Sequence, residues 1–377
     1  MDNIFIYELM AVVFSALIAF ILTPIVRVLA FRVKALDVPD KTRHLHPDIT
    51  PTLGGLAIFI SFVVNVLIFC DLNRETAVLL AGTVVIVAVG VLDDIFQLNA
   101  WVKLAGEIVA AAVPIAFGLR IEFLTFFGVT VNLGVLSIPI TLFWILLLTN
   151  SINLIDGMDG LACGVSSIAA TTILVCSLIL SQGNVALLMG ILAGSCLGFL
   201  PFNLNPARIF MGDTGALSLG YVFSVVSVMG LYKFSTAITF IIPIIIFGLP
   251  FGDTFSAIFR RIKHHKGIFQ GDHDHFHHKL QALGFSQKQA VIILYAISAV
   301  LGISAVFFTL HDWTIGVCIL TFTALAGYIN MLIFKGSDTT RAQTGLGLSY
   351  MERPPKKQKH KHQTDDQDPS PSQEENK

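Results

Sequence analysis

The sequence predicts an all-α polytopic membrane protein of about eleven transmembrane helices, with its N-terminus outside and its C-terminus in the cytoplasm. Three observations lead to this fold class: the composition, the length of the apolar runs and the distribution of Lys and Arg. Of 377 residues, 54% are hydrophobic and 13% are charged, and the mean hydropathy is +0.77. Soluble domains are only about 45–50% apolar, so we expect lipid to be the main solvent of this chain.

The apolar runs have the length of membrane helices. A helix needs about 20 apolar residues to cross a bilayer. Stretches of this kind have the approximate limits 4–28, 51–70, 76–92, 100–118, 136–150, 160–181, 185–201, 214–231, 236–258, 288–309 and 313–334. The first stretch lacks the basic segment and the cleavage site of a signal peptide, so we expect it to be retained. Residues 1–335 then form one transmembrane domain, and the polar, Pro- and Lys-rich residues 336–377 are predicted to be a disordered cytoplasmic tail.

Lys and Arg lie almost entirely on one side of this layout. Of the 24 such residues, 21 fall in segments on one side, and the other side has Arg74, Arg120 and Lys233. Cytoplasmic loops near membrane helices retain positive charge. The N-terminus is therefore predicted to be outside and the C-terminus inside.

Polar and acidic residues, which are unfavourable inside a membrane, occur at helix ends on the predicted cytoplasmic side. Asp93 and Asp94 end the third helix, where two adjacent carboxylates repel each other unless a cation neutralises them. This pattern indicates a divalent metal, a phosphate held through one, or a general base; a solvated pair at a helix end is the alternative. Lys103, ten residues further on, is a candidate phosphate partner.

A second polar group follows the fifth helix. Asn153, Asp156 and Asp159 stand at three-residue steps, and Gly157 and Gly160 directly follow the two acids. This spacing brings the polar groups together if the segment is helical, and glycine lets the backbone approach a ligand closely. The alternative is an Asn/Asp/Gly turn between two membrane helices.

A third polar group has a single acid, Asp213, which stands between two glycines just before an apolar helix. Asp at this position is either a helix cap or a ligand. Mg²⁺ takes few carboxylates and completes its shell with carbonyl oxygens, waters and substrate phosphates. Asp213 together with Asn153 would suit Mg²⁺, whereas zinc would favour His or Cys.

A histidine cluster follows the ninth helix. His275, His277 and His278, followed by Lys279, can bind a transition metal, donate to phosphate oxygens or form a solvated basic loop. The spacing lacks the second ligand pair of a closed zinc site. With carboxylates elsewhere, the pattern favours phosphate binding.

The loop after the first helix is also cationic. Lys41, Arg43 and His46 provide charge and donors, and Gly54 and Gly55 offer close backbone donors for a diphosphate or a base. An ordinary positive-inside loop is the alternative.

Taken together, these motifs resemble one family. D-x-P-D…R-x-x-H…P-x-x-G-G, L-D-D, N-x-x-N-x-x-D-G-x-D-G, F-M-G-D-T-G and H-x-H-H occur in this order over residues 10–335. They are similar to the motifs of the polyprenyl-phosphate N-acetylhexosamine-1-phosphate transferases. The H-F-H-H-K-L segment resembles the branch of teichoic-acid and enterobacterial-antigen initiators, while the muramyl-pentapeptide branch typically has three consecutive histidines.

The resemblance implies an enzyme of the bacterial plasma membrane with a cytoplasmic active site. It would transfer GlcNAc-1-phosphate from UDP-GlcNAc to undecaprenyl phosphate, release UMP and begin a teichoic acid or similar polymer. Its implied cofactor is Mg²⁺, with Mn²⁺ as a substitute. No nucleic acid is expected, and a homodimer stays open. The implied roles are catalysis for Asp93 and Asp94, metal binding for Asn153 and Asp213, and substrate binding for Asp156, Asp159, Lys103, Arg43, His46, His275, His277 and His278.

The chain departs from the family pattern at His44, Ile49 and Glu107, where Lys, Pro and Gln are common. These departures affect the details of nucleotide contact. The alternatives are a phospho-MurNAc-pentapeptide transferase of the same superfamily, a secondary transporter, and a metal-binding scaffold that uses the histidines. Transporters place acids near the bilayer midplane and often have inverted repeats, whereas these acids lie at helix ends. Both a single displacement and a phospho-enzyme route are compatible with the sequence.

Overall fold

The structure is a computed structural model that describes residues 2–37, 49–126, 129–233, 237–263 and 276–325. At 2–5, 125–126, 231–233, 237–240 and 277–278 it describes the backbone alone. The chain divides into two units, Met1–Thr323 and Ala324–Lys377, and the helices and strands named below belong to the first, apart from the last residues of the helix Trp313–Leu325. The predicted tail lies outside the described residues.

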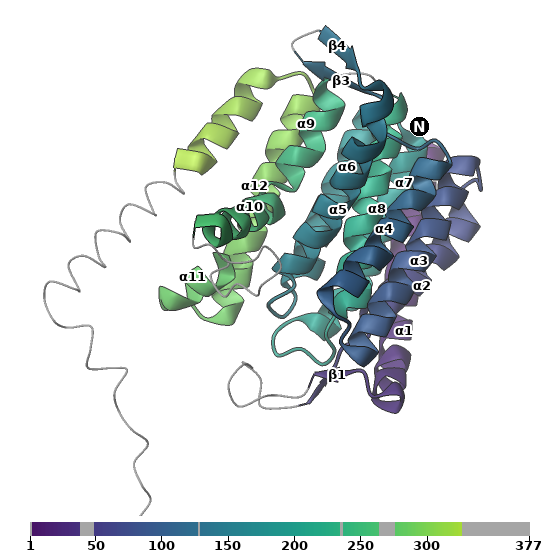
Figure 1. The fold of residues 1–377 in the computed structure, drawn as a ribbon, viewed down its shortest axis with the longest axis vertical. Coiled ribbons are helices and arrows are strands. Elements are labelled where there is room, and N and C mark those ends of the chain that lie inside the picture. The colour runs from purple at the N-terminus through teal and green to yellow at the C-terminus, as the bar shows by residue number, and fades with distance from the viewer. Residues whose placement is uncertain (1, 38–48, 127–128, 234–236, 264–275, 326–377) are drawn as a thin grey trace, which may run out of the picture. The chain divides into compact units, whose positions relative to one another are not determined.

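The described chain is mostly helical (Figure 1). Its α-helices are α1 (Asp2–Val33), α2 (Gly55–Phe69), α3 (Arg74–Phe96), α4 (Ala100–Ala116), α5 (Ser137–Ile155), α6 (Leu161–Ile179), α7 (Gly183–Asn203), α8 (Gly212–Lys233), α9 (Ala237–Ile246), α10 (Gly248–Lys263), α11 (Phe276–Ala282) and α12 (Gln287–Thr309). A short 3₁₀ helix, η1 (Gly134–Leu136), precedes α5, and a further apolar helix covers Trp313–Leu325.

Every predicted apolar stretch contains helix, but the stretches differ in their capacity to cross a membrane. Among the described residues, seven helices are long and apolar enough, and they lie in Ile6–Val33, Arg74–Phe96, Gly134–Ile155, Leu161–Ile179, Gly183–Asn203, Gly212–Gly230 and Gln287–Thr309. Gly55–Phe69 and Trp313–Leu325 are shorter apolar helices. In the described parts of the predicted stretches 100–118 and 236–258, no helix falls in either class, the candidate spans or the shorter apolar helices.

The ninth predicted stretch is divided into α9 and α10 at Phe247. Pro243 and Pro250 cannot donate the backbone hydrogen bonds of a continuous helix, which weakens the helical ladder on both sides of the break. Helix α10 then ends in a basic turn with Arg260, Arg261 and Lys263. The sequence-based prediction took 236–258 as one stretch and did not locate the break at Phe247.

Two small antiparallel sheets depart from the all-α prediction. Strands β1 (Leu36–Asp37) and β2 (Thr50–Pro51) pair on either side of the loop that follows α1. Strands β3 (Phe123–Phe126) and β4 (Val129–Asn132) pair with Phe123 opposite Asn132. The aromatic and β-branched residues of this second pair favour strands, and the prediction missed that signal.

Helix α8 is the centre of the packing and therefore positions the site. It packs against α3, α5 and α2. In its most apolar segment of 18 residues, 89% is buried, compared with 28% in the corresponding segment of α1. Its buried side chains include the large aromatic residues Tyr221 and Phe223. Since the surrounding helices run along α8, residues at their ends meet around its first turn.

Candidate active site

The ammonium group of Lys103 lies at the centre of a polar cluster formed by the ends of four helices. Its Nζ is 3.2 Å from Asp93 Oδ2 at the end of α3, and it also pairs with Asp213 in the first turn of α8. Residues 93 and 213 are far apart in sequence, and α8 packing against α3 brings them together. Lysine between two carboxylates offsets their mutual repulsion.

Asn153 completes this cluster from the end of α5. With its amide oriented to satisfy its neighbours, the nitrogen donates to Asp213 Oδ1 at 2.9 Å and the oxygen accepts from Lys103 Nζ at 3.0 Å. We call Asp93, Lys103, Asn153 and Asp213 the lysine cluster. Its four members come from α3, α4, α5 and α8, and all were predicted as site residues.

Asp94 has a different position from its neighbour Asp93. Its carboxylate accepts hydrogen bonds from the backbone N–H of Asp213 (2.9 Å), from the N–H of Thr214 (3.0 Å) and from Thr214 Oγ1 (2.6 Å). These donors belong to the first turn of α8, whose N–H groups have no partners within the helix. Asp94 therefore caps α8 from another helix and holds Asp213 in place. Asp93 instead accepts from Leu98 N at 2.6 Å and faces Lys103.

The segment that follows α1 is attached to the residues just before Asp213. Gly54 N donates to Phe210 O at 2.9 Å, Gly55 N donates to Met211 O at 2.8 Å, and Phe210 N donates to Pro51 O at 2.8 Å. The two glycine amides are therefore used within the fold, and the prediction that they serve a diphosphate was wrong for these donors. They fix one end of the cationic loop beside the site.

Asp159 is 4% exposed and accepts from Asn205 Nδ2 (2.9 Å) and Ala207 N (3.0 Å). Asn203 Nδ2 donates to Ile209 O at 3.1 Å. These bonds hold the segment that connects α7 to α8. Asp159 is therefore linked to the site through the segment that precedes α8.

Asp156 lies directly after α5 and is half-buried. Burial raises the pKa of its carboxyl well above the usual range, and the charges of Asp213, Asp94 and Asp159 raise the pKa further, while Lys103 opposes them. Several acids thus share one described cation in the immediate cluster. This excess negative charge favours the binding of another cation.

The oxygen donors of the lysine cluster suit a hard cation. Lys103 occupies a position among two carboxylates and one amide oxygen, and oxygen ligands are those that Mg²⁺ prefers. Within the described ranges, no three His, Cys, Asp or Glu side chains are placed to hold a metal together. A Mg²⁺ ion commonly keeps several waters and substrate phosphates with one or two carboxylates, so the residues present fit this ion.

The remaining predicted residues lie in parts of which the structure describes little. Arg43, His46 and His275 are outside the described residues, and only the backbone is described for His277 and His278, at the start of α11. Helix α11 is attached to α10, because Asp253 Oδ1 accepts from Phe276 N at 3.0 Å. Asp253 is 2% exposed.

Sequence reasoning missed several residues that support the site. Thr214 contributes two of the bonds to Asp94, and Asn150 donates to the buried Glu107, one helical turn beyond Lys103. Thr214 belongs to the F-M-G-D-T-G motif, but its hydroxyl donates to a carboxylate of another helix, which depends on the packing of α3 against α8. Asn150 begins the N-x-x-N motif and Glu107 departs from the family pattern, but no local pattern indicated that these two side chains pair across separate helices.

The fold and the site define a multi-helix membrane protein with an acidic, lysine-bridged site at one end of α8. Comparison with known proteins gives its family. Residues 76–231 match the model of glycosyl transferase family 4. The chain is 42% identical, over 313 residues, to a probable undecaprenyl-phosphate N-acetylglucosaminyl 1-phosphate transferase of Bacillus subtilis, covering 81% of this chain and 86% of the relative.

Two further relatives extend the comparison. A decaprenyl-phosphate N-acetylglucosaminephosphotransferase of Mycobacterium leprae is 34% identical over 314 residues, covering 74% of this chain and 78% of the relative. A phospho-N-acetylmuramoyl-pentapeptide-transferase of Staphylococcus aureus is 28% identical over 332 residues, covering 82% of this chain and all of the relative. The chain therefore belongs to the polyprenyl-phosphate N-acetylhexosamine-1-phosphate transferase family, as its motifs predicted.

Proposed function

We propose that this protein transfers GlcNAc-1-phosphate from UDP-GlcNAc to undecaprenyl phosphate, giving undecaprenyl-diphosphate-GlcNAc and UMP. The observation that carries the proposal is the lysine cluster at the start of α8, in a chain 42% identical to the Bacillus subtilis relative. The product would start a cell-wall polymer such as teichoic acid. The higher identity to the N-acetylglucosamine transferases than to the pentapeptide transferase supports this donor.

The reaction is a phosphoryl transfer between two lipid- and nucleotide-bound groups. An oxygen of the lipid phosphate attacks the phosphorus that bears the sugar, the bond from this phosphorus to the bridging oxygen breaks, and UMP leaves with that oxygen. Protein groups mainly position the reactants and stabilise charge in such reactions. A lipid phosphate is already a competent nucleophile at neutral pH, so the site needs no strong base.

The residues of the cluster divide this work. Bound Mg²⁺, or Mn²⁺ in its place, would neutralise the diphosphate and the charge on the departing phosphate. Asp213 and Asn153 would hold the ion, and the ammonium group of Lys103 would pair with a phosphate oxygen. Both carboxylate oxygens of Asp93 and of Asp94 already have partners within the protein, through hydrogen bonds or an ion pair. This arrangement favours a positioning role for the two acids, and a single displacement over a phospho-enzyme.

The nucleotide sugar would be gripped from the surrounding segments. Asp156 lies beside the cluster, and α11 brings the backbone of His277 and His278 into a helix tied to α10. Arg43 and His46 belong to the loop whose end is fixed to Phe210 and Met211, next to Asp213. Arginine and histidine side chains can donate to phosphate or sugar oxygens, whereas a carboxylate such as that of Asp156 can accept from sugar hydroxyls.

We assign the lysine cluster to the cytoplasmic face of a plasma-membrane protein with eleven crossings and its N-terminus outside. Support comes from charge, because 21 of the 24 Lys and Arg residues fall on that side. The attachment of Gly54 and Gly55 to Phe210 and Met211 also supports it, since it joins the basic end of α1 to the start of α8. In this layout, α9 and α10 together form the ninth crossing.

The test uses purified full-length protein with undecaprenyl phosphate, Mg²⁺ and a panel of UDP-sugars, and it measures UMP release. We expect UMP with UDP-GlcNAc and little with UDP-GalNAc. UMP release from UDP-MurNAc-pentapeptide alone would make the chain a pentapeptide transferase. Substrate uptake into vesicles without UMP release would indicate a transporter and contradict the proposal.

The role of the histidines needs a separate measurement. If His277 grips the nucleotide sugar, His277→Ala should raise KM for UDP-GlcNAc or lower kcat while the Mg²⁺ requirement stays unchanged. Initial rates over a matrix of UDP-GlcNAc and Mg²⁺ concentrations distinguish this role from metal binding. Rescue by excess Mg²⁺ would assign His277 to the ion, and unaltered rates would leave it a solvated basic residue.

A further inference from the structure

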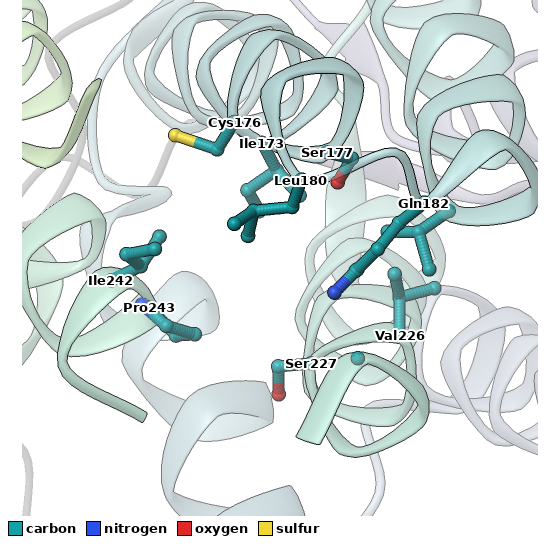
Figure 2. A pocket seen from close by; sticks show the side chains of 11 residues that line it. Ile173, Cys176, Ser177, Leu180, Gln182, Val226, Ser227, Ile242 and Pro243 are labelled. Carbon is teal, nitrogen blue, oxygen red and sulfur yellow. The ribbon is translucent and has the colours of Figure 1, made fainter. Parts of the chain in front are cut away.

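A pocket lies between α6, the start of α7, α8 and α9 (Figure 2). The pocket is partly open, and its space free of protein atoms, about 420 Å³, includes the space outside its mouth. Its walls are mainly apolar, and its lining residues include Ile173, Leu180, Gln182, Val226, Ile242 and Pro243. Figure 2 shows the side chains of these residues around a common space.

This pocket is at the opposite end of the helices from the lysine cluster. The cluster lies at the end of α5 and the start of α8, so the α5–α6 and α7–α8 connections are at its end of the bundle. The connection from α6 to α7, which contains Leu180 and Gln182, is then at the other end. The pocket is thus separate from the proposed active site, and its function does not rest on the proposed reaction.

Gln182 provides an unpartnered donor inside the pocket. The residue is 8% exposed, and its Nε2 is buried without a hydrogen-bond partner. In Figure 2 this nitrogen points into the pocket, and the hydroxyl of Ser177 also borders the space. An unmet buried donor is unfavourable, so the pocket is built for a ligand that carries an acceptor oxygen. Ser227 is already engaged, since it accepts from Trp144 Nε1 and donates to Ser224 O.

The side of the pocket faces lipid, which determines where a ligand comes from. Beside the lining residues of α6, Val175, Leu178 and Ile179 are 38–39% exposed, and Ile244 of α9 is 40% exposed. Exposed apolar residues on a membrane helix are in contact with acyl chains. A ligand that enters here is therefore a component of the bilayer with an apolar body.

The depth of Gln182 identifies the acceptor. Helix α6 has 19 residues, a rise of about 28 Å at 1.5 Å per residue, which matches the roughly 30 Å of a hydrocarbon core. Gln182 follows the end of α6 by three residues and so lies at the boundary between hydrocarbon and headgroups. The ester carbonyls of phospholipids are located at this boundary, whereas an isoprenoid chain has no oxygen there.

We propose that the pocket binds a fatty acyl chain of a membrane phospholipid, with the ester carbonyl accepting a hydrogen bond from Gln182 Nε2. The chain occupies the space between Ile173, Leu180, Val226 and Ile242, and the headgroup stays outside. The pocket is thus a structural lipid site on the face of the membrane opposite the lysine cluster.

Trp144 serves as the reporter, because its indole contacts Ser227 on the pocket wall. The full-length protein, with Trp101 and Trp313 replaced by Phe, is placed in nanodiscs that contain increasing fractions of a phospholipid with brominated acyl chains. Bromine quenches tryptophan at short range. The control is a second protein in which Trp313, an exposed residue, is the sole tryptophan. We expect Trp144 to be quenched at a lower fraction of brominated lipid than Trp313 is in this control.

The hydrogen bond is tested from both partners. An ether-linked brominated lipid, which lacks the ester carbonyl, should bind about five- to tenfold more weakly, the loss expected for one hydrogen bond. Gln182→Met should show a similar weakening for the ester lipid and little difference between ester and ether lipids. Equal quenching of Trp144 by both lipids in the protein that retains Gln182 and has Trp144 as its sole tryptophan would contradict the role of Gln182. Quenching of Trp144 no stronger than that of Trp313 would overturn the lipid site itself.

Discussion

Replacing Asp94 by Asn separates the two acids that the sequence presents as a pair. Asp94 receives three hydrogen bonds from the first turn of α8, whereas Asp93 faces Lys103. An Asn side chain has one acceptor oxygen, so its amide nitrogen would face either the N–H of Asp213 or the donors of Thr214. At least one charge-assisted bond is lost, and the helix N-terminus loses a carboxylate.

The expected loss follows from these contacts. A hydrogen bond to a charged group contributes about 1.5–3 kcal/mol, and a carboxylate at a helix start about 0.3–1 kcal/mol. We therefore expect Asp94→Asn to lower stability by about 3 kcal/mol, which corresponds to a fall in Tm of roughly 4 °C for a chain of this size. Because Asp213 shifts with the first turn of α8, kcat should fall by about 100-fold or more.

The measurements are the Tm of the detergent-solubilised protein and the rate of UMP release, with Asp93→Asn as the matched control. Asp93→Asn retains an acceptor for Leu98 N, so it should reduce the rate with a smaller change in Tm. If Asp94→Asn abolished activity at an unchanged Tm, Asp94 would act directly on a substrate and the capping role would be refuted. A lowered Tm with normal activity would show that the cap does not position Asp213.

Three further predictions test the metal, α11 and the topology. UMP release should stop in EDTA and return with Mg²⁺ or Mn²⁺, since the site offers oxygen ligands; full turnover in chelator would exclude a metal role. Asp253→Ala should raise KM for UDP-GlcNAc about tenfold, because it removes the acceptor for Phe276 N and so releases α11. Asp253→Asn keeps an acceptor and should have a much smaller effect. Equal effects of both variants would contradict this positioning role. In intact cells, with Cys318 replaced by Ser, a cysteine at Arg120 should react with an impermeant maleimide and one at Lys361 should not; labelling of both positions would contradict the proposed topology.

The sequence predicts most of the helices because a bilayer imposes a length and an apolar composition on each one. The prediction fails where an average conceals local chemistry. Pro243 and Pro250 divide the stretch 236–258, yet the mean hydropathy of the stretch is high enough to suggest one crossing. The β3–β4 pair lies between two predicted membrane helices, where only its aromatic and β-branched residues indicated strands.

The sequence indicated the types of the site residues and their place at helix ends, but it did not indicate which residues contact each other. Asp93, Lys103, Asn153 and Asp213 each stood out as polar residues at the ends of apolar helices, and the structure brings all four together. No local pattern distinguishes Asp93 from Asp94, because the difference arises from which of the two faces the start of α8. This contact joins residues about 120 positions apart, and it depends on the packing of α3 against α8.

The glycines of the two motifs around Asp213 permit a close backbone approach, as the sequence predicted, but the approach is to another part of the chain. Close approach of the backbone was expected at Gly54 and Gly55, and it occurs, but the partners are the carbonyls of Phe210 and Met211. Gly212 has φ +69°, and a Cβ there would lie 1.9 Å from Thr52 O and 2.6 Å from the carboxylate of Asp94. A side chain at Gly212 would therefore push the α8 start away from Asp94. The glycines bring the loop after α1, the end of α3 and the first turn of α8 together, and this contact sets the place of Asp213 before any ligand binds.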